Sequence, residues 1–327
     1  MNNYDIKSRY QTPEQSSMNF AISMSKTWII FLQIVGSVLA VIGLVSGMVF
    51  FNSLDYNTIN PKYKLGVPVL FSILSYSLWR TISTAFVIVR FLKQATNEQI
   101  VSNRYILASL SLNLGGFFTP WLLTSLPNIE TNSTIKPKWF LSRVFSVITL
   151  VGFAILLVAL LLQLNKVTGG NISSAFNKTN PYYSITIVLI FISVLFILVG
   201  VPSIALYYNK NSEEQFEDDT STSTTMRIFA YFYLVVTTIE LFIVMWLCLL
   251  RLVGGFSRLI NAFDNDGGIN PFAVLFALIY IIFQITYVLF LWRMIVEVIK
   301  GIWKRDGIIK LSIYDKLKAR EKMLRAK

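Results

Sequence analysis

Long apolar runs separated by short polar links dominate the chain. A helix that crosses a bilayer needs about 20 mostly apolar residues, and six runs reach this length. No link between them is long enough to bury a core of its own. The pattern therefore predicts an all-α polytopic membrane protein with a transmembrane domain over 28–299, an N-terminal tail over 1–27 and a C-terminal tail over 300–327. The six runs are Trp28–Phe51, Val67–Phe91, Trp139–Leu164, Tyr183–Tyr208, Ile228–Leu252 and Phe272–Ile299.

A seventh apolar segment, Tyr105–Pro127, is nearly long enough to cross but is interrupted in its middle. The interruptions are Asn113, Gly115, Gly116 and Pro120. Non-helical backbone at membrane depth is tolerated only where protein or a water-filled cavity covers it. We therefore expect a broken re-entrant or interfacial segment, which is a candidate gate formed by these four residues, with Asn113 and freed backbone carbonyls as its polar groups. The alternative is an amphipathic helix at the inner leaflet with the two glycines as a bend.

The distribution of basic residues predicts the topology. The 300–327 tail is the most basic stretch, and the N-terminal tail and the region over 90–143 are also rich in Lys and Arg. Positively charged segments tend to stay in the cytoplasm. Two cytoplasmic ends require an even number of crossings, so we expect about six transmembrane helices in the cell membrane. The alternative is seven transmembrane helices with the N-terminus outside.

Composition supports the membrane assignment and narrows the chemistry. The chain is 54% hydrophobic and 14% charged, whereas about 25% charged residues is usual in soluble proteins. It has no histidine and one cysteine, Cys248, and it contains no nucleotide-binding or nucleophile motif. We therefore expect no metal, no cofactor and no enzymatic activity.

Two opposite charges, Arg80 and Glu240, fall near the middle of apolar runs. An unpaired charge at this depth costs roughly 3 kcal/mol or more, so the two side chains are expected to pair. Thr237 and Thr238, one turn before Glu240, are candidates to support its carboxylate by hydrogen bonds. The pair would act either as a switch that breaks and reforms or as a static clamp between helices.

Other polar and small residues suggest packing and lipid contacts. Gln33 and Gln284 lie inside the first and last runs, where they would bond across helices or line a polar path. Small residues recur on one face of the first run, which favours close helix packing: Gly36, Ala40, Gly43 and Gly47. The pattern of the C-terminal tail predicts a basic amphipathic helix that lies on the membrane surface. The side chains expected to contact anionic lipid headgroups are Lys316, Lys318, Arg320, Lys322 and Arg325.

These features favour a transport component or permease for a small solute or ion, with the Arg80–Glu240 pair as its switch. The alternative is a non-catalytic membrane scaffold or assembly protein that docks partners through its cytoplasmic tails. The partners expected are the lipid bilayer and either a second protein or a second copy of the chain. Nucleic acid is not expected, because the basic tail lacks the interleaved aromatic residues that stack on bases.

Overall fold

The computed structural model describes residues 13–112, 118–126, 137–177, 181–216, 218–263 and 271–303. Within these ranges the chain is all-α, with no strand, and six helices are long and apolar enough to cross a membrane. The predicted all-α polytopic fold is thus confirmed. The six helices are α2 (Pro13–Ser53), α4 (Gly66–Gln94), α8 (Pro137–Val167), α9 (Tyr183–Tyr207), α11 (Ser221–Phe263) and α12 (Pro271–Ile302).

The interrupted segment between α4 and α8 does not form a seventh crossing in its described part. It contains two short helices that pack against each other, each too short to span the hydrocarbon. Asn113, Gly115 and Gly116 lie outside the described residues. The short helices of the structure are α3 (Pro61–Lys64), α5 (Asn97–Ser102), α6 (Arg104–Leu110), α7 (Thr119–Thr124) and α10 (Ser212–Gln215), with one 3-10 turn, η1 (Ile172–Phe176).

Two of the long helices extend well beyond their apolar runs. Helix α2 begins at Pro13, so half of the expected N-terminal tail is helical. Helix α11 has 43 residues, which correspond to about 65 Å at 1.5 Å per residue. Because the hydrocarbon core is about 30 Å thick, α11 has to tilt strongly or reach into water at its ends.

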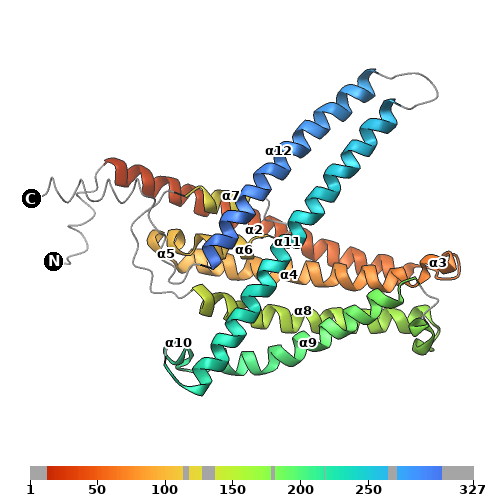
Figure 1. Ribbon diagram of the computed structural model, residues 1–327, viewed down its shortest axis with the longest axis horizontal. Helices are drawn as coiled ribbons and strands as arrows, with labels where there is room; N and C mark the ends of the chain where they lie inside the picture. The colour runs from red at the N-terminus through yellow and green to blue at the C-terminus, as the bar shows by residue number, and fades with distance from the viewer. Residues whose placement is uncertain are drawn as a thin grey trace, which may run out of the picture.

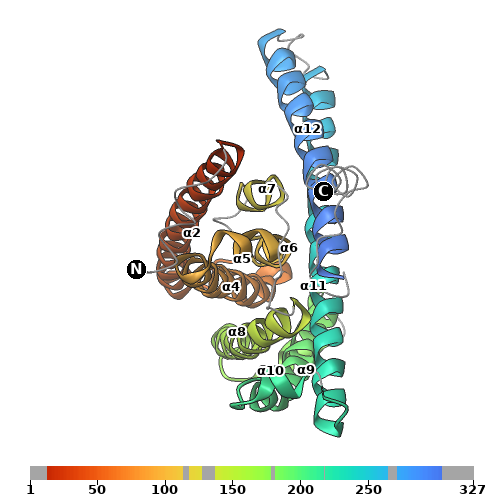
Figure 2. The same ribbon diagram turned by 90° about the vertical axis from the view of Figure 1, so that its left-hand side faces the viewer.

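The long helices form two groups. Helices α2, α4, α8 and α9 pack in chain order and form a four-helix body (Figure 1). Helices α11 and α12 pack along each other as a hairpin, which crosses the body at a steep angle and runs past it (Figures 1 and 2). The C-terminal part of α11 and the N-terminal part of α12 therefore lie away from the body, while the rest of the hairpin faces α4, α6 and α8.

Two of the four small residues of α2, Gly43 and Gly47, lie toward α4, and the other two are buried. Gly36 and Ala40 are buried, and a Cβ atom added at Gly43 would be 3.5 Å from Leu78 of α4. At Gly47 the same atom would be 3.7 Å from Leu74. These are ordinary van der Waals distances, so the face predicted from the glycine spacing allows α2 and α4 to approach closely.

The link between α2 and α4 is fastened to the body through Tyr56. Its buried hydroxyl donates to Gln163 Oε1 of α8 at 2.7 Å and lies 3.2 Å from the Phe51 carbonyl. Burial raises the pKa of Tyr56 above the ordinary 10.0, because a phenolate would lose its hydration there. The hydrogen bond from Tyr56 to Gln163 is therefore kept only while Tyr56 keeps its proton.

This fastening predicts an alkaline loss of stability. A raised pKa means that the folded state holds the proton more tightly, so the contribution of Tyr56 is complete below its unfolded pKa and is lost as the pH rises through the folded pKa. Above pH 10 the thermal midpoint of the wild-type protein in detergent should fall more steeply than that of Tyr56→Phe. Parallel curves for the two proteins between pH 8 and pH 11 would contradict the assignment.

Candidate functional site

Arg80 and Glu240 meet between the four-helix body and the α11–α12 hairpin. Arg80 lies at the middle of α4 and Glu240 near the middle of α11, and their Nη2 and Oε2 atoms are 2.6 Å apart. The side chains are only 19% and 20% exposed before any lipid is considered. The structure therefore brings together the two charged residues that lie near the middle of apolar runs. Without this contact, each would lack a counter-charge at this depth.

Helix α8 completes the surroundings of the pair. The Arg80 guanidinium lies 5.7 Å from the centre of the Phe145 ring, and the Tyr76 hydroxyl, one turn earlier on α4, is close enough to interact with it. Gly152 of α8 makes room for Tyr76, because a Cβ atom there would come within 2.8 Å of the Tyr76 ring. Three helices thus hold the guanidinium in place.

The pair is close but not ideally hydrogen-bonded. Glu240 Oε2 is buried and has no well-aligned hydrogen-bond donor among the described residues, although the Arg80 nitrogen is near. A buried ion pair offsets its desolvation fully only when the remaining lone pairs are also satisfied. The carboxylate is therefore held mainly by the charge of Arg80, and either charge would be left uncompensated if the two side chains separated.

Thr237 and Thr238 do not support Glu240 as expected. Their hydroxyls donate to carbonyls of their own helix one turn back, those of Tyr233 and Leu234, at 2.8 Å each. This is a common arrangement for threonine in a helix, where the preceding carbonyls are the nearest acceptors. Thr238 in addition accepts a hydrogen bond from Trp303 Nε1 at 2.9 Å, which ties α11 to the end of α12.

The α6–α7 hairpin, formed by the two short helices, fills the space between the body and the end of α12. It packs against α2 and α4 on one side and α12 on the other, and Figure 2 shows it between them. Every residue of α6 except the half-buried Tyr105 is buried. Pro120 lies in the first turn of α7, where the missing N–H removes no helix bond. The described part of the interrupted segment, α6 and α7, is thus a compact unit between these helices, and we call it the plug.

Two buried polar contacts hold this plug. Gln33 of α2 donates through Nε2 to Thr119 Oγ1 at 3.0 Å, and Arg104 donates through Nη1 to the Leu126 carbonyl at 2.8 Å. Arg104 is only 4% exposed, and its guanidinium lies 4.9 Å from the centre of the Tyr105 ring. In the sequence, Arg104 indicated only on which side of the membrane its region lies, because it falls in a polar link and not in an apolar run.

The Gln33 contact gives a direct test of how firmly the plug is held. Thr119→Val removes the hydroxyl with little change of shape, so the thermal stability in detergent should fall by about 1 kcal/mol, as for other hydrogen bonds between membrane helices. Gln284→Leu is the matched control, since Gln284 is half-buried on α12 and has no cross-helix hydrogen bond among the described residues. The loss caused by Thr119→Val should be smaller in a Gln33→Leu background, where this bond is already absent. Additive losses would contradict the bond.

The remaining candidate residues are not placed by the structure. The basic residues of the C-terminal tail, from Lys316 to Arg325, lie outside the described residues. Within the described part of the chain, no group of three acidic, cysteine or histidine side chains is positioned to hold a metal ion.

Comparison with protein-family models, curated proteins and solved structures finds no match to this chain.

Proposed function

We propose that this multi-pass membrane protein is a transport component for a small solute or ion, with the interface between the four-helix body and the α11–α12 hairpin as its path. The observation that supports this most is the Arg80–Glu240 pair, which joins α4 to α11 although these two helices make little direct contact. Separating the pair would break little direct packing between α4 and α11, while α11 packs on the body chiefly through α8. Ionisable groups inside a membrane are functional candidates by default.

The α6–α7 hairpin supplies the second part of the proposed mechanism. It occupies the same interface at one end, between α2, α4 and α12, where the Gln33–Thr119 and Arg104–Leu126 hydrogen bonds help to hold its two short helices. Interrupted helices at membrane depth are a recurring feature of transport sites. In the proposed cycle, the ion pair opens when the α11–α12 hairpin tilts, and the plug opens or closes the adjacent end.

The same geometry suggests an orientation. The end of α4 and the start of α8 share one end of the body with the start of α2 (Figure 1), and Arg90, Lys93, Lys138 and Arg143 lie there. By the positive-inside tendency we place this end in the cytoplasm, in the cell membrane, with both chain termini on that side.

A distance measurement tests the transport proposal. Spin labels on exposed Ser77 of α4 and Thr286 of α12, in a Cys248→Ala background, would report the separation of the two groups in liposomes. Two distance populations are expected for the wild-type pair. The double variant Arg80→Gln, Glu240→Gln should change the ratio of the two populations. The control variant Gln284→Leu should leave this ratio unchanged. One narrow distance that neither change affects would contradict a moving interface.

A scaffold is the second candidate, supported by the shape of the α11–α12 hairpin. The part of it that runs past the body exposes large apolar side chains, including Val253, Phe256, Phe272, Phe276 and Ile279. In this role the ion pair would be a permanent clamp, and a partner protein or second copy would pack on the hairpin. A photo-crosslinking residue at Phe276 should then give one defined protein adduct in membranes, unlike the same residue at exposed Phe191 of α9.

A further inference from the structure

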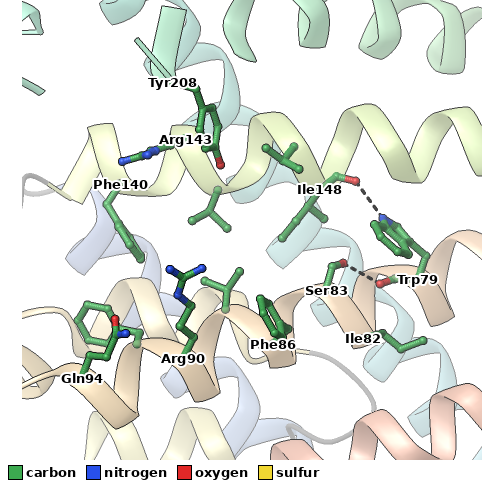
Figure 3. Close-up of a pocket in the computed structure, with 14 residues that line it drawn as sticks. Trp79, Ile82, Ser83, Phe86, Arg90, Gln94, Phe140, Arg143, Ile148 and Tyr208 are labelled. Carbon is green, nitrogen blue, oxygen red and sulfur yellow. Dashed lines mark hydrogen bonds between the residues drawn. The ribbon is translucent and has the colours of Figure 1, made fainter. Parts of the chain in front are cut away.

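A groove of about 700 Å³ runs between α4 and α8, and neither Arg80 nor Glu240 lines it. Its floor and walls are mainly apolar, with Ile82 and Phe86 from α4 and Val147 and Ile148 from α8. Figure 3 shows Trp79 and Ile148 toward one end, and Arg90, Gln94, Phe140 and Arg143 toward the other. The groove is open along its side, since Phe86 is 66% exposed.

The basic end of the groove lies close to the edge of the membrane-spanning segments. Arg90 is one turn from the end of α4, and Arg143 is in the second turn of α8. A smaller adjoining cavity of about 200 Å³ is lined by Arg90 and Lys93, which extends the basic corner toward the aqueous side. The groove therefore joins an apolar channel in the hydrocarbon to a cationic corner at headgroup level.

The two guanidinium groups lack an anionic partner within the described part of the chain. Neither Arg90 nor Arg143 forms an ion pair with a carboxylate there. The Arg143 guanidinium stacks on two rings, 5.0 Å from the centre of Trp139 and 4.5 Å from that of Tyr208. Stacking on the ring faces orients the planar guanidinium group but leaves its N–H groups available. Two of these N–H groups can donate hydrogen bonds to two oxygens of one phosphate.

We propose that this groove binds an anionic phospholipid, with its phosphate between Arg90 and Arg143 and one acyl chain along Ile82, Phe86 and Ile148. Charge complementarity selects the phosphate, and the apolar walls that open to the bilayer select the chain. The volume lies within the range of about 300–1,000 Å³ that is usual for ligand pockets. A soluble anion would leave the apolar part of the groove without a partner.

The proposal is tested by native mass spectrometry of the full chain released from nanodiscs that contain phosphatidylglycerol and phosphatidylcholine. The wild-type protein should retain phosphatidylglycerol and lose phosphatidylcholine. Arg90→Gln, which alters an exposed side chain, should weaken phosphatidylglycerol retention at least tenfold. Arg251→Gln, which removes the same charge from an exposed position on α11, is the matched control and should leave retention unchanged.

Two further arms separate the lipid from other sources of the same chemistry. Val147→Trp fills the apolar part, so it should weaken lipid retention while Arg90 and Arg143 are intact. Inorganic phosphate at millimolar concentration should not raise the thermal midpoint, whereas phosphatidylglycerol in detergent should. The proposal would be overturned if the wild-type protein retained phosphatidylcholine as well as phosphatidylglycerol, or if Arg251→Gln lost as much phosphatidylglycerol as Arg90→Gln. It would also be overturned if inorganic phosphate stabilised the protein and Val147→Trp did not change lipid retention. Arg143→Lys keeps the positive charge but removes the paired N–H groups of the guanidinium. If Arg90→Gln fails to fold, Arg143→Lys replaces it and should likewise weaken phosphatidylglycerol retention.

Discussion

Arg80→Glu should destabilise the protein by at least about 3–5 kcal/mol, since it replaces an ion pair with two like charges near the middle of the bilayer. Removing one partner of a buried pair is costly because the remaining charge keeps its desolvation penalty and loses its compensation. The double variant Arg80→Glu, Glu240→Arg should recover part of the loss. Recovery should be incomplete, because Phe145, Tyr76 and Gly152 surround a guanidinium that extends from α4.

The measurement is unfolding in mixed micelles, with helix content followed by circular dichroism. The control is the Arg293–Glu297 pair within α12, whose atoms are 3.5 Å apart and whose side chains are 84% and 41% exposed. Exposed pairs contribute at most about 1 kcal/mol, so Arg293→Glu should change stability little. A double charge reversal at positions 80 and 240 that is no more stable than the single one would show that the two side chains do not depend on each other.

Gly301→Ala should be the most damaging single-methyl change in the described part of α12. A Cβ atom at this buried glycine would overlap the ring of Tyr105 in α6, the ring on which Arg104 stacks. Either α12 or the α6–α7 hairpin would have to shift, at a cost near the upper end of the usual 1–3 kcal/mol for overpacking. The expected result is a lower thermal midpoint and stronger labelling of a cysteine introduced at Thr119.

Two comparisons make this prediction specific. Gly254→Ala in α11 adds a methyl group where no atom lies within 4 Å, so it should be neutral or stabilise by up to about 1 kcal/mol through helix propensity. Tyr105→Ala combined with Gly301→Ala should be less damaging than the sum of the two single changes, because the smaller side chain leaves room for the methyl group. Additive losses would show that Gly301 and Tyr105 are not in contact.

The membrane architecture follows from local properties of the sequence. Each apolar run is long enough to span, and each lies within one of the six long helices except for Tyr208, which is one residue beyond the end of α9. The segment containing Pro120 is interrupted, and its described parts form only the short helices α6 and α7. These features depend on the hydropathy and backbone preferences of neighbouring residues, which sequence reasoning can evaluate directly.

The pairing of Arg80 with Glu240 followed from the sequence for a related reason. Only one opposite charge is available at a similar depth in another apolar run, so the large cost of an unpaired charge leaves one plausible partner. Thr237 and Thr238 offered no such constraint. A hydroxyl can bond to its own helix at no extra cost, and both do.

What the sequence alone determined is therefore the set of helices, the broken segment and the charges that had to meet. The tertiary structure decided the steep crossing of the α11–α12 hairpin, the burial of Arg104 and the groove beside Arg90 and Arg143. Hydropathy reports how deep a residue lies in the membrane but not which neighbour it faces. That choice depends on how the side chains of several helices fit together, which no single run encodes.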